Sequence, residues 1–116
     1  MKEENIALEK SYKFAIRTVK LYQYLTREKR EYVLSKQVLR SGTSIGSNIE
    51  EAVGGFSRKD FLAKISIAYK EARETKYWLR LLSEGGYLEK SFFESIFQDC
   101  DELCKILAQT LITCNR

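Results

Sequence analysis

Apolar residues recur at intervals of three and four in four stretches of the chain, and short polar or glycine-containing segments separate these stretches. Such spacing places apolar side chains on one face of an α-helix, so the pattern predicts helices over about residues 5–25, 31–53, 57–84 and 91–113. The chain contains no proline. Because short connections between long helices favour antiparallel neighbours, residues 1–116 are expected to form a single all-α domain, an antiparallel up-down-up-down four-helix bundle.

The first predicted helix has more apolar surface than one core needs. Its inward face is expected to comprise Leu8, Tyr12, Ala15, Ile16, Val19 and Tyr22. Phe14, Leu21 and Leu25 fall largely outside this face. Because large exposed apolar patches are typical of protein interfaces, we expect another copy of the chain to cover these three side chains.

The middle of the second predicted helix has weak helix propensity. Ser41-Gly42-Thr43-Ser44 combines a glycine, which is about 1 kcal/mol worse than alanine in a helix, with hydroxyl groups that compete for backbone hydrogen bonds. The expected compensation is a close approach by a neighbouring helix, which small residues allow. The residues assigned to this helix packing are Gly42, Ser44, Gly46 and Asn48. A loop over residues 41–44 is the alternative.

Glycine pairs and capping residues mark the predicted helix ends. Gly54-Gly55 follows the second helix and Gly85-Gly86 follows the third. Ser57, three residues before Asp60, has the spacing of an N-cap for the third helix. Ser91-Phe92-Phe93-Glu94 has the pattern of a capping box for the fourth.

Charge is unevenly distributed along the chain. The formal net charge is +4, and residues 1–80 hold 17 of the 20 basic groups but 10 of the 16 acidic groups. Basic residues form two stripes at helical spacing, Lys10-Lys13-Arg17-Lys20 and Lys70-Arg73-Lys76-Arg80. Since a basic surface can bind nucleic-acid phosphates, we assign phosphate contacts to Lys13, Arg17, Lys20, Arg73, Lys76 and Arg80. The alternative is that both stripes are solvated faces that form ion pairs.

No group of residues indicates a particular reaction. Ser44 and Asn48 lie four apart beside Glu50 and Glu51, but an asparagine in a bundle more often fixes helix register than binds a ligand. A hydrolase that uses Glu50 or Glu51 is a further alternative, although acid–base catalysis would require a partner in a cleft. We therefore expect no catalytic residues and no enzymatic activity.

The three cysteines, Cys100, Cys104 and Cys114, all lie in the last predicted helix, and the chain contains no histidine. We expect them to be small buried apolar residues, with no metal site and no cofactor; a soft-metal pair of Cys100 and Cys104 is the alternative. Aromatic residues at helical spacing are expected in core or subunit contacts, with stacking on single-stranded bases as the alternative. They are Tyr12, Tyr22, Tyr69, Tyr77 and Trp78.

The chain carries neither a run of about 18 apolar residues nor a basic-then-apolar leader. We therefore expect a cytoplasmic protein that does not contact membranes.

Val38 through Leu82 resembles the four-helix-bundle family of the 23S rRNA intervening-sequence protein. In the second helix the matching residues are Arg40, Ser41, Gly42, Ser44-Ile45, Asn48-Ile49, Glu50, Glu51 and Gly54-Gly55. In the third they are Arg58, Phe61, Leu62, Ala68, Glu71, Glu74 and Leu79. Two positions depart from the family pattern: Glu50-Glu51-Ala52 stands where many relatives have Ala-Glu-Gly, and Gly46 replaces a proline that is common after Ser-Ile.

The resemblance implies a small bacterial cytoplasmic bundle that assembles as a homo-oligomer, with a pentameric ring as one form. It brings no catalytic residues. The function that we expect is a non-enzymatic oligomer that binds RNA, DNA or a nucleic-acid-handling protein through its basic surface. The alternative is a structural protein–protein adaptor with no nucleic-acid role.

Overall fold

The computed structural model describes the backbone of residues 2–114 and the side chains of residues 5–114. It contains four long helices: α1 (Lys2–Arg27), α2 (Leu34–Val53), α3 (Arg58–Glu84) and α4 (Lys90–Cys114). No strand occurs among the described residues. The predicted four-helix bundle is therefore confirmed, and α2 is helical through residues 41–44, which excludes the loop alternative.

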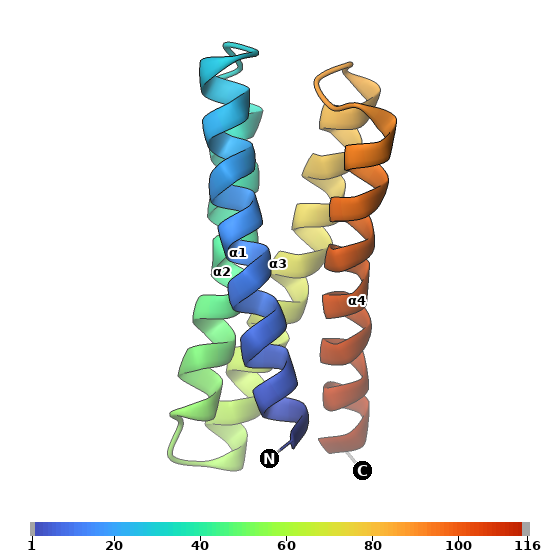
Figure 1. Ribbon diagram of the computed structural model, residues 1–116. Helices are drawn as coiled ribbons and strands as arrows, with labels where there is room; N and C mark the ends of the chain where they lie inside the picture. The colour runs from blue at the N-terminus through green and yellow to red at the C-terminus, as the bar shows by residue number, and fades with distance from the viewer. Residues whose placement is uncertain (1, 115–116) are drawn as a thin grey trace.

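Successive helices pack side by side, and the chain turns at alternate ends of the bundle (Figure 1). The bundle measures 44 × 20 × 19 Å. α2 packs between α1 and α3, whereas α4 packs mainly on α3 and makes fewer contacts with α1. Within the described residues α1 and α3 lie diagonally opposite, without close backbone contacts. We call the end with the α1–α2 and α3–α4 turns the upper end.

The core runs the length of the bundle and receives side chains from every helix. Its fully buried large side chains include Leu25 of α1, Ile45 of α2, Leu79 of α3 and Ile96 of α4. None of the helices in the described part of the chain has the length and apolar character that a membrane crossing requires.

The predicted inward face of α1 is wrong. Phe14 and Leu21 are each 2% exposed, so these side chains assigned to a partner lie in the core of this chain, as does Leu25. The predicted inward residues Tyr12, Ile16 and Val19 are instead 65%, 41% and 41% exposed. Both faces of α1 are apolar, and periodicity alone does not say which one meets the other helices.

Small residues decide which face of α1 is buried. Ser11 and Thr18 are buried against α2, where a Cβ on Gly46 would lie 3.3 Å from the Ser11 carbonyl oxygen and a Cβ on Gly42 would lie 2.4 Å from Thr18 Cγ2. The predicted close packing at the two glycines therefore occurs, and α1 is the neighbouring helix. It compensates for the low helix propensity of this part of α2.

Ser44 and Asn48 do not bridge helices through hydrogen bonds. The Ser44 hydroxyl donates to the Arg40 carbonyl at 2.7 Å, and the Asn48 amide donates to the Ser44 carbonyl at 2.8 Å. Both bonds stay within α2. The polar bridge that sequence reasoning missed joins Ser41 to Thr75 of α3, whose buried hydroxyls are 2.8 Å apart.

Residues that carry the family resemblance meet between α2 and α3. Arg40 forms ion pairs with Glu71, at 3.3 Å, and with Glu74. The indole of Trp78 donates to Glu74 at 2.9 Å. The motif thus holds two adjacent helices together, which gives it a structural role.

α2 begins at Leu34, later than the predicted start near residue 31, because Glu31 acts as its cap. The Glu31 carboxylate accepts the backbone N–H groups of Val33, Leu34 and Ser35 at 3.1, 2.9 and 2.6 Å. These bonds replace a side-chain cap from the residue directly before the helix.

Of the two capping residues predicted for α3 and α4, one is confirmed and the other is wrong. Ser57 caps α3 as expected by accepting from the Asp60 N–H at 3.1 Å. The predicted capping box at Ser91 is wrong, because α4 already begins at Lys90. The Glu89 carbonyl accepts from the Phe93 N–H at 2.9 Å, so the residue at the cap position is Glu89, two residues before Ser91.

Candidate nucleic-acid interface

The basic stripe of α1 faces α4, and part of its charge is neutralised there. Arg17 pairs with Asp99 at 2.7 Å, and Lys10 pairs with Glu102. Lys13 pairs with Glu9 on α1 itself, at 2.9 Å. The Lys10–Glu102 pair raises the pKa of Lys10, and the Lys13 hydrogen bond lowers the pKa of Glu9. Three of the four cations in this stripe therefore have carboxylate partners.

The basic residues of α3 lie on the other side of α4. Lys76 pairs with Asp101 of α4 at 2.7 Å, and its ammonium lies 5.3 Å from the centre of the Phe97 ring. The hydrogen bond that Lys76 donates to Asp101 raises the pKa of Lys76. Arg73 lies over Tyr69, and Arg80 borders a hollow between α3 and α4. Arg17 and Lys76 thus pair with Asp99 and Asp101 of the same helix, so the two basic stripes lie on either side of α4.

The excess of positive charge is concentrated in the upper half of α1 and the turn after it. Residues 17–36 contain six Lys and Arg but only two acidic residues, so their net charge of +4 equals that of the whole chain. The carboxylate of Glu31, one of those two acids, is occupied by its backbone bonds. Lys20, Arg27 and Lys29 form no ion pair with another described residue.

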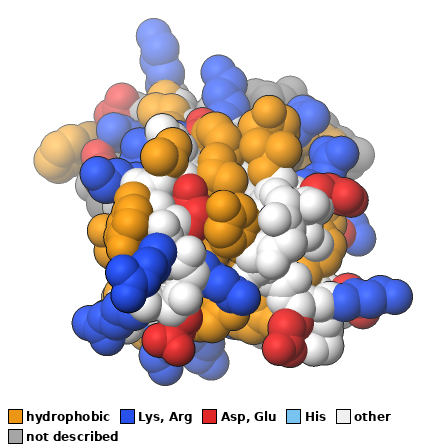
Figure 2. All heavy atoms as spheres, turned by 90° about the horizontal axis from the view of Figure 1, so that it is seen from above, with side chains coloured by type: hydrophobic (Ala, Val, Ile, Leu, Met, Phe, Trp, Pro, Cys, Tyr) orange, Lys and Arg blue, Asp and Glu red, His pale blue; other side chains and the backbone are white. Residues whose placement is uncertain are grey.

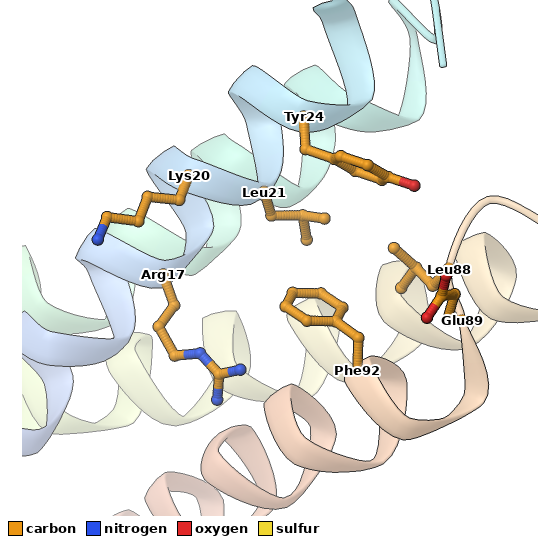
Figure 3. A pocket seen from close by; sticks show the side chains of 7 residues that line it. All are labelled: Arg17, Lys20, Leu21, Tyr24, Leu88, Glu89 and Phe92. Carbon is orange, nitrogen blue, oxygen red and sulfur yellow. The ribbon is translucent and has the colours of Figure 1, made fainter. Parts of the chain in front are cut away.

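A groove of about 410 Å³ opens beside this segment, between α1 and the start of α4. It is lined by Arg17, Lys20, Leu21, Tyr24, Leu88, Glu89 and Phe92. Figure 3 shows Leu21 and Phe92 pointing toward each other across it, with Arg17 and Lys20 on one side and Tyr24, Leu88 and Glu89 on the other. We call it the α1–α4 groove.

The walls of the α1–α4 groove are held in place by the bundle. Leu21 and Leu88 are buried and form its apolar floor. The Arg17 guanidinium, fixed by Asp99, lies 5.5 Å from the centre of the Phe92 ring. Lys29 lies 5.9 Å from the centre of the Tyr24 ring. Each aromatic ring of the groove thus has a cation beside it.

The upper end of the molecule combines the two kinds of side chain that nucleic acids contact. Figure 2 shows hydrophobic side chains near the middle of this end, with Lys and Arg side chains around them and several acidic ones between. Aromatic rings beside cations suit a single strand, because bases stack on rings while phosphates pair with cations.

Sequence reasoning missed most of the groove. The basic residues in and beside the groove lie on one face of α1. On this face Lys13, Arg17, Lys20, Tyr24 and Arg27 follow one another at intervals of four and three. This repeat was the available signal for Tyr24 and Arg27. Phe92 comes from α4 and Glu89 directly precedes that helix, and nothing in the sequence pattern joins them to α1.

The other candidate sites have structural explanations. Glu51 pairs with Lys64 at 2.9 Å, and both Glu50 and Glu51 are exposed. Among the described residues, no group of three or more His, Cys, Asp or Glu could hold a metal. Cys100 and Cys104 are buried, and the neighbouring Cys104 thiol, together with burial, raises the pKa of Cys100. Of the five aromatic residues singled out, Tyr12 and Tyr77 are exposed.

Comparisons with known proteins agree on one family. The family model of the 23S rRNA-intervening sequence protein matches residues 3–109. A crystal structure at 1.70 Å resolution, of a protein of unknown function from the S23 ribosomal protein family of Bacteroides thetaiotaomicron, is 49% identical in sequence. The two structures align with a TM-score of 0.92 over 94% of this chain and 97% of that one. No curated protein matches the chain.

Proposed function

Because the chain belongs to the 23S rRNA-intervening sequence protein family, we propose that it is a non-enzymatic, homo-oligomeric protein of the bacterial cytoplasm that binds nucleic acid or a nucleic-acid-handling protein. Its contact surface is the α1–α4 groove and the basic segment beside it. The observation that carries this proposal is the position of the charge: the net +4 of residues 17–36 lies next to a groove with two aromatic rings.

Self-association is supported by the exposed apolar stripe on α1, which comprises Tyr12, Ile16 and Val19. These side chains are spaced at four and three, so they lie on one face of α1. Lys20 is four residues after Ile16 and borders the stripe, whereas Arg17, Leu21 and Tyr24, which line the groove, lie farther round α1. A subunit covered along the stripe would therefore keep the groove side of α1 accessible, and a ring of subunits would add the charges of several copies.

A structural adaptor is the second candidate, and the ion pairs favour it. Arg17 and Lys76 each hold α4 through an aspartate, and Arg40 holds α3 through two glutamates. Cations used in this way stabilise the bundle and are less available to phosphates. In the adaptor, the remaining cations would only maintain solubility.

Filter binding of a single-stranded RNA at two salt concentrations tests the first proposal against the second. We compare the wild type with the triple variant Lys20→Gln/Arg27→Gln/Lys29→Gln. The control is Lys13→Gln/Lys64→Gln/Lys105→Gln, which removes the same charge from residues that are already paired.

Each lost phosphate contact should reduce the slope of log affinity against log salt by about 0.7, so the test variant should lose about two units of slope. The control should lose much less. RNA binding that is absent in the wild type, or equally weakened in both variants, would reject this surface as a nucleic-acid interface.

A further inference from the structure

We propose that the α1–α4 groove holds one unpaired nucleobase of a single-stranded nucleic acid, and that it favours a base with an exocyclic amino group. This inference rests on the proposed function and specifies which part of the nucleic acid enters the groove. The shape, the apolar walls and the separation of charge in the groove support it.

The dimensions of the groove suit a single nucleotide. Its volume of about 410 Å³ lies near the lower limit of the 300–1,000 Å³ typical of small-ligand sites. In a duplex the bases are stacked and paired, so none is available to enter such a space. Single-stranded segments present unstacked bases, which proteins hold against aromatic side chains.

The walls of the groove provide an apolar, partly aromatic space. Leu21 and Leu88 are buried in its floor, and Tyr24 and Phe92 stand on opposite sides, one from each helix (Figure 3). Tyr24 is partly exposed, so a base can reach its ring without unfolding either helix. Stacking of this kind tolerates any base, because every base has a flat face.

The positive and negative side chains of the groove lie apart, as the phosphate and the base of a nucleotide do. Lys20 and Arg17 lie at one side, and Glu89 lies at the other, with the apolar floor between them (Figure 3). Arg17 is committed to Asp99, which leaves Lys20 as the cation for a phosphate. A nucleotide placed with its phosphate at Lys20 therefore has its base over Leu21 and its outer edge toward Glu89.

Glu89 gives the groove a preference among bases. A carboxylate accepts hydrogen bonds, so it can pair with the N4 amino group of cytosine. Uracil has a carbonyl oxygen at the same position, so two hydrogen-bond acceptors, this oxygen and the Glu89 carboxylate, would face each other. Cytosine should therefore bind more tightly than uracil.

The occupant is part of a polymer and not a free nucleotide, because the cations continue beyond the groove. Arg27 is seven residues after Lys20 on the same face of α1, and Lys29 lies beside the Tyr24 ring. Arg27 and Lys29 would not contact a single phosphate bound at Lys20. They suit the phosphates of neighbouring nucleotides in the strand.

Fluorescence anisotropy with labelled twelve-nucleotide RNAs at constant salt tests the inference. The wild type is measured with oligocytidine, oligouridine and an abasic strand of the same length. The variants are Tyr24→Leu and Glu89→Gln. The control is Tyr77→Leu, which removes an exposed tyrosine of α3 that does not line the groove.

We expect Tyr24→Leu to weaken oligocytidine binding by about tenfold, which is typical of a lost base stack, and to leave abasic-strand binding unchanged. Tyr77→Leu should change neither. Oligocytidine should bind more tightly than oligouridine, and Glu89→Gln should bring the two affinities together, since an amide can also donate to the uracil carbonyl.

The outcomes separate the two proposals. An abasic strand that binds as tightly as oligocytidine, or a Tyr24→Leu variant with unchanged affinity, would overturn the base in the groove but leave the basic surface intact. Equal affinities for oligocytidine and oligouridine would overturn the role of Glu89. No binding of any strand would overturn both the inference and the proposed function. Inhibition by cytidine monophosphate as strong as by oligocytidine would show that the groove takes free nucleotides.

Discussion

Gly42 of α2 lies so close to Thr18 of α1 that a Cβ at position 42 would be 2.4 Å from Thr18 Cγ2 and 3.0 Å from Thr18 Cβ. Thr18 is fully buried, and its hydroxyl donates to the Ala15 carbonyl at 2.8 Å. The side chain therefore cannot move aside without losing that bond. This contact sets the separation of α1 and α2 at mid-bundle.

Gly42→Ala should destabilise the protein, although alanine is the better helix former. Overpacking costs about 1–3 kcal/mol, whereas the gain in helix propensity is about 1 kcal/mol. We expect a lower free energy of unfolding in urea, by as much as about 2 kcal/mol. In a Thr18→Ala background the cost should shrink, because the Cγ2 contact is gone. A Gly42→Ala variant that is more stable than the wild type would show that the helices separate freely.

The cap at Glu31 predicts a pH-dependent stability. Burial raises the pKa of Glu31, but the backbone bonds from Leu34, Ser35 and Val33 lower it by more, so the net shift is downward from 4.5. A carboxyl with a depressed folded-state pKa stabilises the protein above its unfolded pKa, and this contribution is lost as the pH falls through the folded value.

Glu31→Gln should therefore cost about 1 kcal/mol at pH 7 and progressively less below about pH 4. Thermal unfolding followed by circular dichroism across this pH range measures the difference. Glu28→Gln, which changes an exposed carboxylate in the same turn, is the control. The cap assignment fails if both variants lose the same stability at pH 7.

The buried hydroxyl pair of Ser41 and Thr75 predicts unequal effects of removing either partner. The Thr75 hydroxyl also lies 2.8 Å from the Glu71 carbonyl and can donate to it, so Ser41→Ala leaves Thr75 satisfied. Thr75→Val instead leaves the buried Ser41 hydroxyl without this partner, at a cost of about 1–3 kcal/mol. The double variant should cost less than the sum of the single variants in urea unfolding. Additive effects would mean that the pair is not coupled.

The bundle was predictable from the sequence because each helix carries its own signal. Apolar periodicity, the glycine pairs and Ser57 act locally, so the helix positions follow from neighbouring residues. The start of α2 was missed because Glu31 reaches forward to three backbone N–H groups, whereas the apolar pattern alone places the helix start earlier. Small residues at Gly42 and Gly46 indicated close packing, but not which helix supplies it.

Two features depended on contacts between distant segments, and these could not be predicted. α1 is apolar on two faces, and only Ser11 and Thr18 packed on the glycines of α2 show which face is inside. The α1–α4 groove needs Tyr24 and Phe92 from opposite ends of the chain. Likewise, Asp99 and Asp101 compensate Arg17 and Lys76, although no local pattern connects these residues.

The exposed apolar stripe of α1 leads to the final prediction. If a second subunit covers Tyr12, Ile16 and Val19, then Ile16→Gln/Val19→Gln should dissociate the oligomer without unfolding the subunit, because neither side chain is buried within it. A matched control exists in Val53→Gln/Ile67→Gln, whose side chains are 42% and 43% exposed, compared with 41% for both substituted residues of the stripe, Ile16 and Val19.

Light scattering coupled to size exclusion measures the mass of each variant at micromolar concentration. The wild type and the control should share one oligomeric mass, and the stripe variant should have a lower one. A monomeric wild type would remove self-association from the proposed function, and the same mass for all three proteins would move the interface away from this face of α1.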